Sequence, residues 1–252
     1  MLDDSLQLPL WSDQDRVDGW TIRASQRARR LTVRVFHTGR VEVVAPARSS
    51  QRTVQLFIER HRTWIERKRE EARRNAGPEE NFPPASIALH ANGEAWKLHL
   101  AGGRGRPRVR VAGPQLLSIE GEATRRQAVC EALRKWLMRY AAASLVPQLE
   151  ACARQLDVSF RRALIRRQRT RWGSCSARGT ISLNCCLLFQ RPEVVEYLFV
   201  HELVHTRHMN HSVRFWHEVG RHCADYRRLD RELLDGWRRV PSWVFGDFRD
   251  GS

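Results

Sequence analysis

The fold of this chain is decided by a short stretch that reads His201-Glu202-Leu203-Val204-His205. Two histidines four residues apart lie on the same face of a helix, so both imidazoles can bind one ion. Glu202 is too constrained to be a third ligand beside them, but it is well placed to hold a water molecule on that ion. The stretch has the H-E-x-x-H pattern of zinc hydrolases, in which the glutamate acts as general base.

The residues around this motif predict a buried helix that begins at Pro192. Proline suits the first helical position, where a missing N–H has no helical partner to lose. Leu203 and Val204, between the two histidines, are apolar, so the helix is expected to be buried on most sides. The polar side chains of a buried helix need bonding partners, and a metal ion can be that partner for the two histidines and the glutamate. Ser212 then predicts the N-cap of a second helix.

The third ligand is expected at His211, because the three histidines then fall at positions one, five and eleven. Metzincins have this spacing with a glycine at position eight, where this chain has His208. Asn210 tolerates the left-handed backbone conformation and is expected to make the turn instead. His208 and His217 stay open as rival ligands. Three neutral nitrogens leave a fourth position for water, so we expect one catalytic rather than structural zinc ion per chain.

The composition sets broad limits on what the chain can do. Its 252 residues suffice for one large domain or two modest ones, and a hydrophobic content of 42% allows a real core. The net charge of +16 comes mainly from arginine. Such a charge indicates a polyanion partner, an acidic substrate or simply an arginine-rich composition. No stretch approaches the roughly 20 apolar residues that a membrane helix needs.

The cysteines and the N-terminus predict a cytoplasmic protein. The six cysteines are scattered and form no C-x-x-C pair, so they are interpreted as reduced thiols. The first residues are acidic and do not resemble a secretory signal.

Hydrophobic patterning predicts an α+β protein. Alternating apolar residues predict a β-hairpin over residues 31–43 and a second β region over residues 87–119. A helix is expected between them, from Ser49 or Ser50 to about Asn75. A longer helix is expected over residues 122–156, kinked or divided at Pro147.

Four regions are expected along the chain. Residues 1–19 form an acidic lead-in, and residues 20–130 form an N-terminal α+β region. Residues 131–240 form the catalytic region, and residues 241–252 form a C-terminal tail.

A second informative stretch precedes the motif helix. Gly173 and Gly179 flank a turn, so residues 171–184 predict another hairpin. In zinc proteases an edge strand beside the metal helix binds an extended substrate by strand addition. Cys175 is interpreted as a packed thiol rather than as a ligand or nucleophile. The candidate substrate-binding residues are Trp172, Gly173, Ser174, Ile181, Asn184 and, after the motif, Arg214.

These stretches together carry a resemblance to a known family. They read Arg171-Trp172-Gly173-Ser174-Cys175-Ser176, Ile181-Ser182-Leu183-Asn184, the H-E-x-x-H motif, His208-Met209-Asn210-His211-Ser212-Val213-Arg214-Phe215-Trp216, and Asp225-Tyr226. In this order and spacing the chain resembles the YgjP-like metallopeptidases and, more distantly, the SprT-like proteases. The resemblance implies a minimal zincin core, with an antiparallel edge hairpin and an active-site helix. It also implies that His201, His205 and His211 are the zinc ligands and that Glu202 is the catalytic base.

The leading hypothesis is zinc-dependent hydrolysis of peptide bonds in a peptide or protein substrate. Zinc lowers the pKa of its bound water, and Glu202 takes the proton and later delivers it to the leaving amine. The oxyanion needs a further donor, for which Tyr226 is preferred over Arg214 and His208.

Three other functions are weighed against it. The arginines of residues 161–171 suit phosphate and suggest hydrolysis of a nucleotide phosphoanhydride, although no carboxylate-rich Mg²⁺ site accompanies them. The net charge and the SprT-like resemblance suggest a protease that associates with nucleic acid. A purely structural zinc module is disfavoured, because Glu202 and an open fourth position serve no structural purpose.

Overall fold

The structure is a computed structural model that describes residues 16–17, 20–36, 39–74 and 82–245. The chain divides into two compact units, residues 1–78 with 249–252 and residues 79–248. Each unit has its own cluster of buried hydrophobic side chains.

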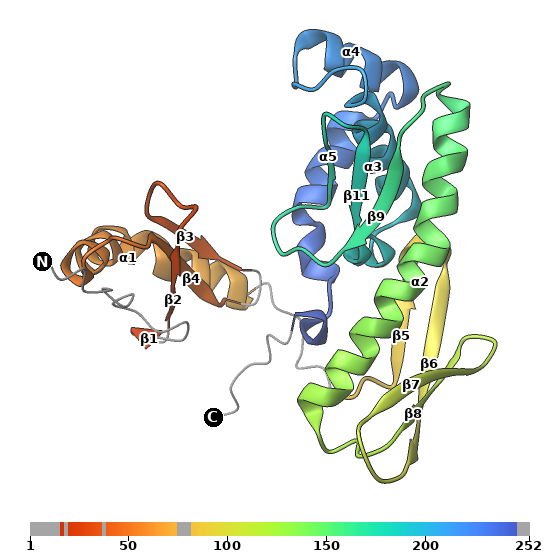
Figure 1. The fold of residues 1–252 in the computed structure, drawn as a ribbon, viewed down its shortest axis with the longest axis horizontal. Coiled ribbons are helices and arrows are strands. Elements are labelled where there is room, and N and C mark those ends of the chain that lie inside the picture. Colours follow the sequence, from red (N-terminus) through yellow and green to blue (C-terminus); the bar gives the residue numbers. More distant parts are fainter. Residues whose placement is uncertain (1–15, 18–19, 37–38, 75–81, 246–252) are drawn as a thin grey trace, which may run out of the picture. The chain divides into compact units, whose positions relative to one another are not determined.

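The first unit is a small sheet with one helix (Figure 1). Its elements are β1 (Arg16–Val17), β2 (Trp20–Ser25), β3 (Thr32–Val35), β4 (Val41–Pro46) and α1 (Gln51–Arg74). The strand order is β1-β2-β4-β3, and β3 and β4 form the expected antiparallel hairpin. The Ser50 hydroxyl caps α1, because it accepts a hydrogen bond of 3.2 Å from the Thr53 N–H. Ile58 and Ile65 of α1 pack with Trp20 in the core of this unit.

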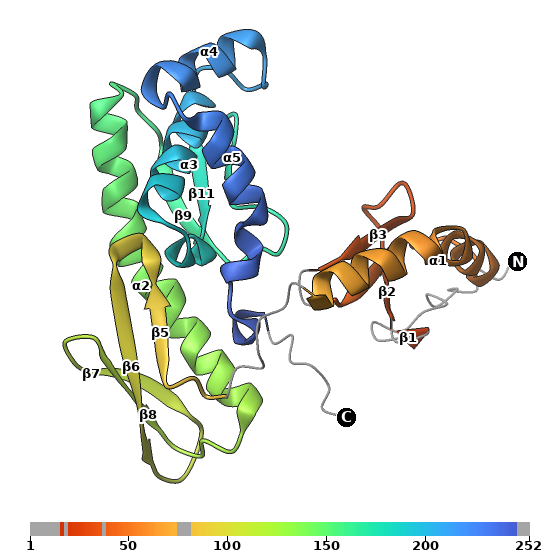
Figure 2. The ribbon, with the colours of Figure 1, turned by 180° about the vertical axis from the view of Figure 1, so that it is seen from behind.

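The second unit begins with a four-stranded sheet. Its strands are β5 (Ser86–Leu89), β6 (Glu94–Gly102), β7 (Arg108–Gly113) and β8 (Leu116–Glu120). Their order is β5-β6-β8-β7, in which β6 and β8 run parallel. Helix α2 (Arg126–Gln155) follows and continues unbroken through Pro147. It contacts β7 and the later strand β9, so it runs past both sheets of this unit (Figures 1 and 2).

The rest of the second unit carries the motif. Its strands are β9 (Arg162–Arg166), β10 (Gly173–Cys175) and β11 (Thr180–Asn184), and its α-helices are α3 (Pro192–Val204), α4 (Val213–His222) and α5 (Tyr226–Asp235). Three short 3₁₀ helices complete it, namely η2 (Cys185–Phe189), η3 (Gly236–Arg239) and η4 (Ser242–Val244). The strand order is β10-β11-β9, and β10 and β11 form the predicted antiparallel edge hairpin.

The described ranges thus contain five α-helices and three small sheets, which confirms the expected α+β class. The compact units divide between residues 78 and 79, whereas the division expected at residues 130–131 falls within α2. The expected catalytic region therefore shares one hydrophobic core with β5–β8. Among the helices of the described residues, none has the length and apolar character needed to cross a membrane.

Leu137→Ala is expected to destabilise the second unit by about 2–5 kcal/mol, because the Leu137 side chain on α2 is fully buried and its truncation leaves a cavity. Urea unfolding followed by circular dichroism measures the change. Arg139→Ala, at an exposed position of the same helix, is the control and is expected to change stability by less than about 0.5 kcal/mol. Equal losses in the two variants would contradict this packing.

Candidate metal centre

Three histidines converge where α3 ends and the chain turns into α4. His201 and His205 lie on α3 and at its C-terminal cap, and His211 lies in the turn before α4. One ring nitrogen of each lies within 4.8 Å of the other two. The Nε2 atoms of His201 and His211 are 3.2 Å apart. We call these three residues the histidine cluster.

Hydrogen bonds on the other side of two rings fix their orientation. The Nδ1 atom of His205 lies 2.9 Å from the His208 carbonyl, so Nδ1 carries the proton. The Nδ1 atom of His201 lies 3.3 Å from the Tyr197 hydroxyl. That hydroxyl donates its own proton to Asp230 Oδ1 at 2.7 Å, so it accepts from His201. In both rings Nε2 is left with a free lone pair that can bind a metal.

The histidine cluster fits a metal ion. Nitrogens bound to tetrahedral zinc at about 2.0–2.1 Å lie roughly 3.3 Å from each other, close to the observed separation of His201 and His211. Burial and then the neighbouring imidazoles of His205 and His211 lower the pKa of His201 to about 3. Burial also lowers the pKa of His205. Neutral imidazoles are the form that binds metal.

The rival ligands lie outside the cluster. The Nε2 atom of His208 is 2.7 Å from Glu218 Oε2 on α4, which holds that ring away from the other histidines. His208 instead serves the site through its carbonyl group. His217 is exposed on α4 and lines a separate pocket. The structure therefore brings together the three histidines that the motif spacing favours.

Glu202 is enclosed without a partner. Glu202 is 4% exposed, and its Oε2 atom has no hydrogen-bond partner in the part of the chain that the structure describes. Burial raises the pKa of this carboxyl to about 8. Burying an unpaired carboxyl group costs folding free energy, so such a group beside a metal site indicates chemistry rather than stability.

Gly173 of β10 packs directly on Glu202. A Cβ atom added at Gly173 would collide with Glu202 Oε1 and crowd its Cδ and Cγ atoms. No other residue type therefore fits between this strand and α3 without moving the carboxyl group. The glycine that the sequence suggested as a turn residue instead lets the edge strand approach the candidate base.

The outer edge of β10 is open among the described strands, since β10 pairs only with β11. The Trp172 carbonyl accepts from Asn184 N–H at 2.8 Å, and Ser176 N–H donates to the Thr180 carbonyl at 3.0 Å. Main-chain groups alternate in direction along an antiparallel strand. Those of Gly173 and Cys175 therefore point away from β11, toward the open edge, and Ser174 between them faces β11.

The other predicted substrate-binding residues occupy different positions. Trp172, Ile181 and Asn184 are buried. The Asn184 amide donates to the carbonyls of Gln168 and Arg171 at 2.7 Å each, so it holds the loop that leads into β10. These three buried side chains support the hairpin from within and are not exposed to a substrate. Arg214 is exposed on α4.

Tyr226 lies one ring away from the histidine cluster. The Trp216 ring stacks on His211 with centroids 5.6 Å apart, and Tyr226 stacks on Trp216 at 5.3 Å. The Tyr226 oxygen accepts a hydrogen bond of 3.1 Å from Arg227 Nε. Cys175 is half-buried, and burial followed by the Glu202 charge raises its pKa to about 11. A protonated thiol agrees with the packed role predicted for it.

Sequence reasoning missed the residues that support the site from a distance. Tyr197 lies four residues before His201, a helical spacing that could have drawn attention to it, whereas Asp230 comes from another helix with no local signal. The larger omission is the packing of residues 236–245, which we call the C-terminal segment, because Trp243 and Val244 are expected in a tail and are in fact buried. Trp237 of this segment stacks on Trp172 at 4.0 Å, next to the strand that contacts Glu202.

Three arginines hold the C-terminal segment through three consecutive carbonyls. Arg134 of α2 donates to the Trp243 carbonyl at 2.8 and 3.0 Å. Arg167 donates to the Val244 carbonyl at 3.0 Å, and Arg169 donates to the Phe245 carbonyl at 2.8 Å. Arg167 and Arg169 belong to the arginine run that suggested the phosphate-binding alternative, and both are thus engaged in the fold.

A helix that carries two histidines and a buried glutamate, with a third histidine after it and an open strand beside it, defines a metal-dependent hydrolase of the metallopeptidase class. The chain belongs to the YgjP-like metallopeptidase domain family, whose model matches residues 29–235. No curated protein matches the chain.

Solved structures of two metallopeptidase zymogens are also similar in part. Abylysin of Pyrococcus abyssi is 24% identical, with a TM-score of 0.33, over 36% of this chain and 92% of its own. Jannalysin of Methanocaldococcus jannaschii is 18% identical, with a TM-score of 0.32, over 36% of this chain and 95% of its own.

Gly173→Ala is expected to lower proteolytic activity by about tenfold or more while metal content is unchanged, because the added methyl group must displace the Glu202 carboxyl. Casein hydrolysis and elemental analysis give the two readouts. Arg178→Ala, exposed in the turn of the same hairpin, is the matched control. Full activity in Gly173→Ala would show that the close packing has no catalytic consequence.

The metal-free protein is expected to gain stability from Glu202→Gln as the pH rises. The folded-state pKa of Glu202 is about 8 against an ordinary 4.5, so the folded wild type binds this proton more tightly than the unfolded chain. The wild type therefore loses stability relative to the variant between about pH 4.5 and pH 8. Urea midpoints of both proteins with a chelator present, at pH 5 and pH 8.5, measure the gap, and a constant gap would refute the shift.

Proposed function

We propose that this chain hydrolyses peptide bonds with one zinc ion bound by His201, His205 and His211 and with Glu202 as general base. The observation that carries the proposal is the buried, unpartnered Glu202 carboxyl beside three converging imidazole nitrogens. A structural zinc site has no need of such a group. Three neutral nitrogen ligands are also a common protein environment for catalytic zinc.

The chemistry divides between the ion and the chain. When bound, zinc activates a water molecule and polarises the substrate carbonyl. Glu202 accepts the proton and returns it to the leaving amine. A pKa raised by burial suits both steps, because a group that is too acidic would hold a proton too weakly to deliver it. Tyr197 and the His208 carbonyl keep the ligand rings in place during the cycle.

The substrate is proposed to bind as an extended strand along β10. The outward main-chain groups of Gly173 and Cys175 can pair with a peptide backbone, as in other cases of strand addition. Because Gly173 also packs on Glu202, a peptide on this edge lies next to the base. Ser174 belongs to the same strand. Trp172, Ile181 and Asn184 are proposed to support it from within, and Arg214 to contact a more distant part of the substrate.

Tyr226 is the proposed oxyanion donor. Arg227 donates to a lone pair of its oxygen, which leaves the O–H proton of Tyr226 available to donate. Stacking on Trp216 holds the ring near His211. The cytoplasm is the proposed location, because the six cysteines are unpaired thiols.

The phosphoanhydride and nucleic-acid alternatives gain no support. Arg167 and Arg169 donate to main-chain carbonyls of the C-terminal segment, so the run of residues 161–171 is not a free set of phosphate ligands.

Glu202→Gln is expected to keep one zinc per chain and to lose turnover by about 10²–10⁴-fold, since it removes only the proton acceptor. His205→Ala is expected to lose both zinc and turnover. Elemental analysis and hydrolysis of a quenched peptide library measure the two quantities on the same samples. Undiminished turnover in zinc-loaded Glu202→Gln would exclude Glu202 as the base.

A further inference from the structure

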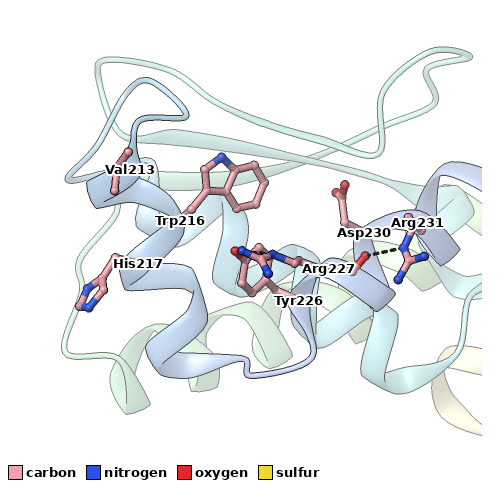
Figure 3. Close-up of a pocket in the computed structure, with 7 residues that line it drawn as sticks. All are labelled: Val213, Trp216, His217, Tyr226, Arg227, Asp230 and Arg231. Atoms are coloured by element: carbon pink, nitrogen blue, oxygen red, sulfur yellow. Dashed lines mark hydrogen bonds between the residues drawn. The ribbon is translucent and has the colours of Figure 1, made fainter.

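A hollow lies between α4 and α5, and Figure 3 shows the side chains that line it. Its volume is about 730 Å³, which is ample for a side chain of a bound peptide. The walls that matter here are the rings of Trp216 and Tyr226 and the polar groups of Arg227, Asp230 and Arg231. The catalytic scheme above leaves most of this space unused.

The hollow is close enough to the cluster for a bound substrate to reach. Trp216 lines it and also contacts His201 and His211, with ring centroids 5.8 and 5.6 Å apart. Asp230 lines it and is joined to His201 through the Tyr197 hydroxyl. An extended peptide advances about 3.3 Å per residue, so a side chain within a few positions of the cleaved bond can enter.

The charges that line the hollow favour an anion. Arg227 and Arg231 have no carboxylate partner among the residues that the structure describes. Arg227 donates to the Tyr226 oxygen, and Arg231 donates to the Arg227 carbonyl at 3.2 Å. Arg228, between them on α5, differs because it pairs with Asp225 at 2.9 Å.

Asp230 is the one carboxylate among the lining residues, and it accepts the Tyr197 hydroxyl proton through Oδ1. Two guanidinium groups against this single carboxylate leave the lining with a net positive charge. Trp216 and Tyr226, whose rings stack on each other, add apolar surface to the lining, and a charged contact beside such surface is stronger than one in open water.

We propose that this hollow binds a carboxylate carried by the peptide substrate, through the guanidinium groups of Arg227 and Arg231. Planar guanidinium groups match the two oxygens of a carboxylate. The carboxylate belongs to an acidic side chain near the cleaved bond or to the C-terminus of the peptide. This inference rests on the proposed function, since it assigns the substrate preference of the same site.

Binding to zinc-loaded Glu202→Gln protein tests the proposal without turnover. The probes are capped alanine hexapeptides with one glutamate placed at each position in turn, their glutamine and phenylalanine counterparts, and all-alanine peptides with a free or an amidated C-terminus. Titration calorimetry gives the dissociation constants. We expect one glutamate position, or the free C-terminus, to bind at least about fivefold more tightly than its neutral counterpart, with the difference shrinking as salt is added.

Variants of the arginines decide whether the hollow causes that difference. In the Glu202→Gln protein, the further changes Arg227→Gln and Arg231→Gln together are expected to remove the affinity difference between acidic and neutral peptides. The further change Arg228→Gln is expected to leave that difference in place. A preference at an internal glutamate identifies an acidic side chain as the source, and one for the free C-terminus alone identifies the terminal carboxylate.

Four results would overturn the proposal: equal binding of acidic and neutral peptides, a preference for phenylalanine alone, no binding at millimolar concentration, or a carboxylate preference that survives in the double arginine variant. Cleavage of the same peptides by the wild type is measured in parallel. A carboxylate preference without any cleavage would refute the proposed peptidase function and leave the carboxylate site standing.

Discussion

The rest of the site depends on the contact between Gly173 and Glu202. A carboxyl group with a buried, unpartnered oxygen is unfavourable in a folded protein, and the surrounding core of α2 and α3 has to offset that cost. The absence of a side chain at Gly173 brings the edge strand onto the carboxyl group and shields it from water. One contact thus raises the proton affinity of the Glu202 carboxyl and, in the proposed function, sets the distance between it and a peptide paired with β10.

Support for the histidine cluster is shared among three helices. Asp230 on α5 orients His201 through Tyr197, and Glu218 on α4 holds His208, whose carbonyl orients His205. The hydrogen bonds from His201 run through Tyr197 to a carboxylate, whereas that from His205 ends at a main-chain carbonyl; both acceptors favour a protonated Nδ1 and leave Nε2 for the ion. Helices α4 and α5 therefore help to build the candidate metal site. Beyond the motif itself, only His211, in the turn before α4, is a direct ligand candidate.

What the sequence could predict follows from the range of the interactions involved. His201, Glu202 and His205 lie within about one helical turn, and Ser212 caps α4 through a residue three positions later. Local sequence spacing was therefore enough to predict this helix and this cap. The parallel pairing of β9 with β11, and of β6 with β8, joins segments that no local pattern relates. The same limit hid Asp230, which lies 33 residues from Tyr197. Alternation along residues 180–184 showed a strand but not that both Ile181 and Asn184 face protein.

The family match ends at residue 235, yet the chain continues into the core beyond that point. Trp243 and Val244 are almost fully buried, and their carbonyls take up the guanidinium groups of Arg134 and Arg167. A gene shortened at the family boundary would encode a protein in which Trp172 loses its stacking partner Trp237. Three arginines would also lose the main-chain carbonyls to which they donate. Recombinant versions of this enzyme should therefore keep the ten residues of the C-terminal segment. A comparison of relatives by length should count them as part of the second unit.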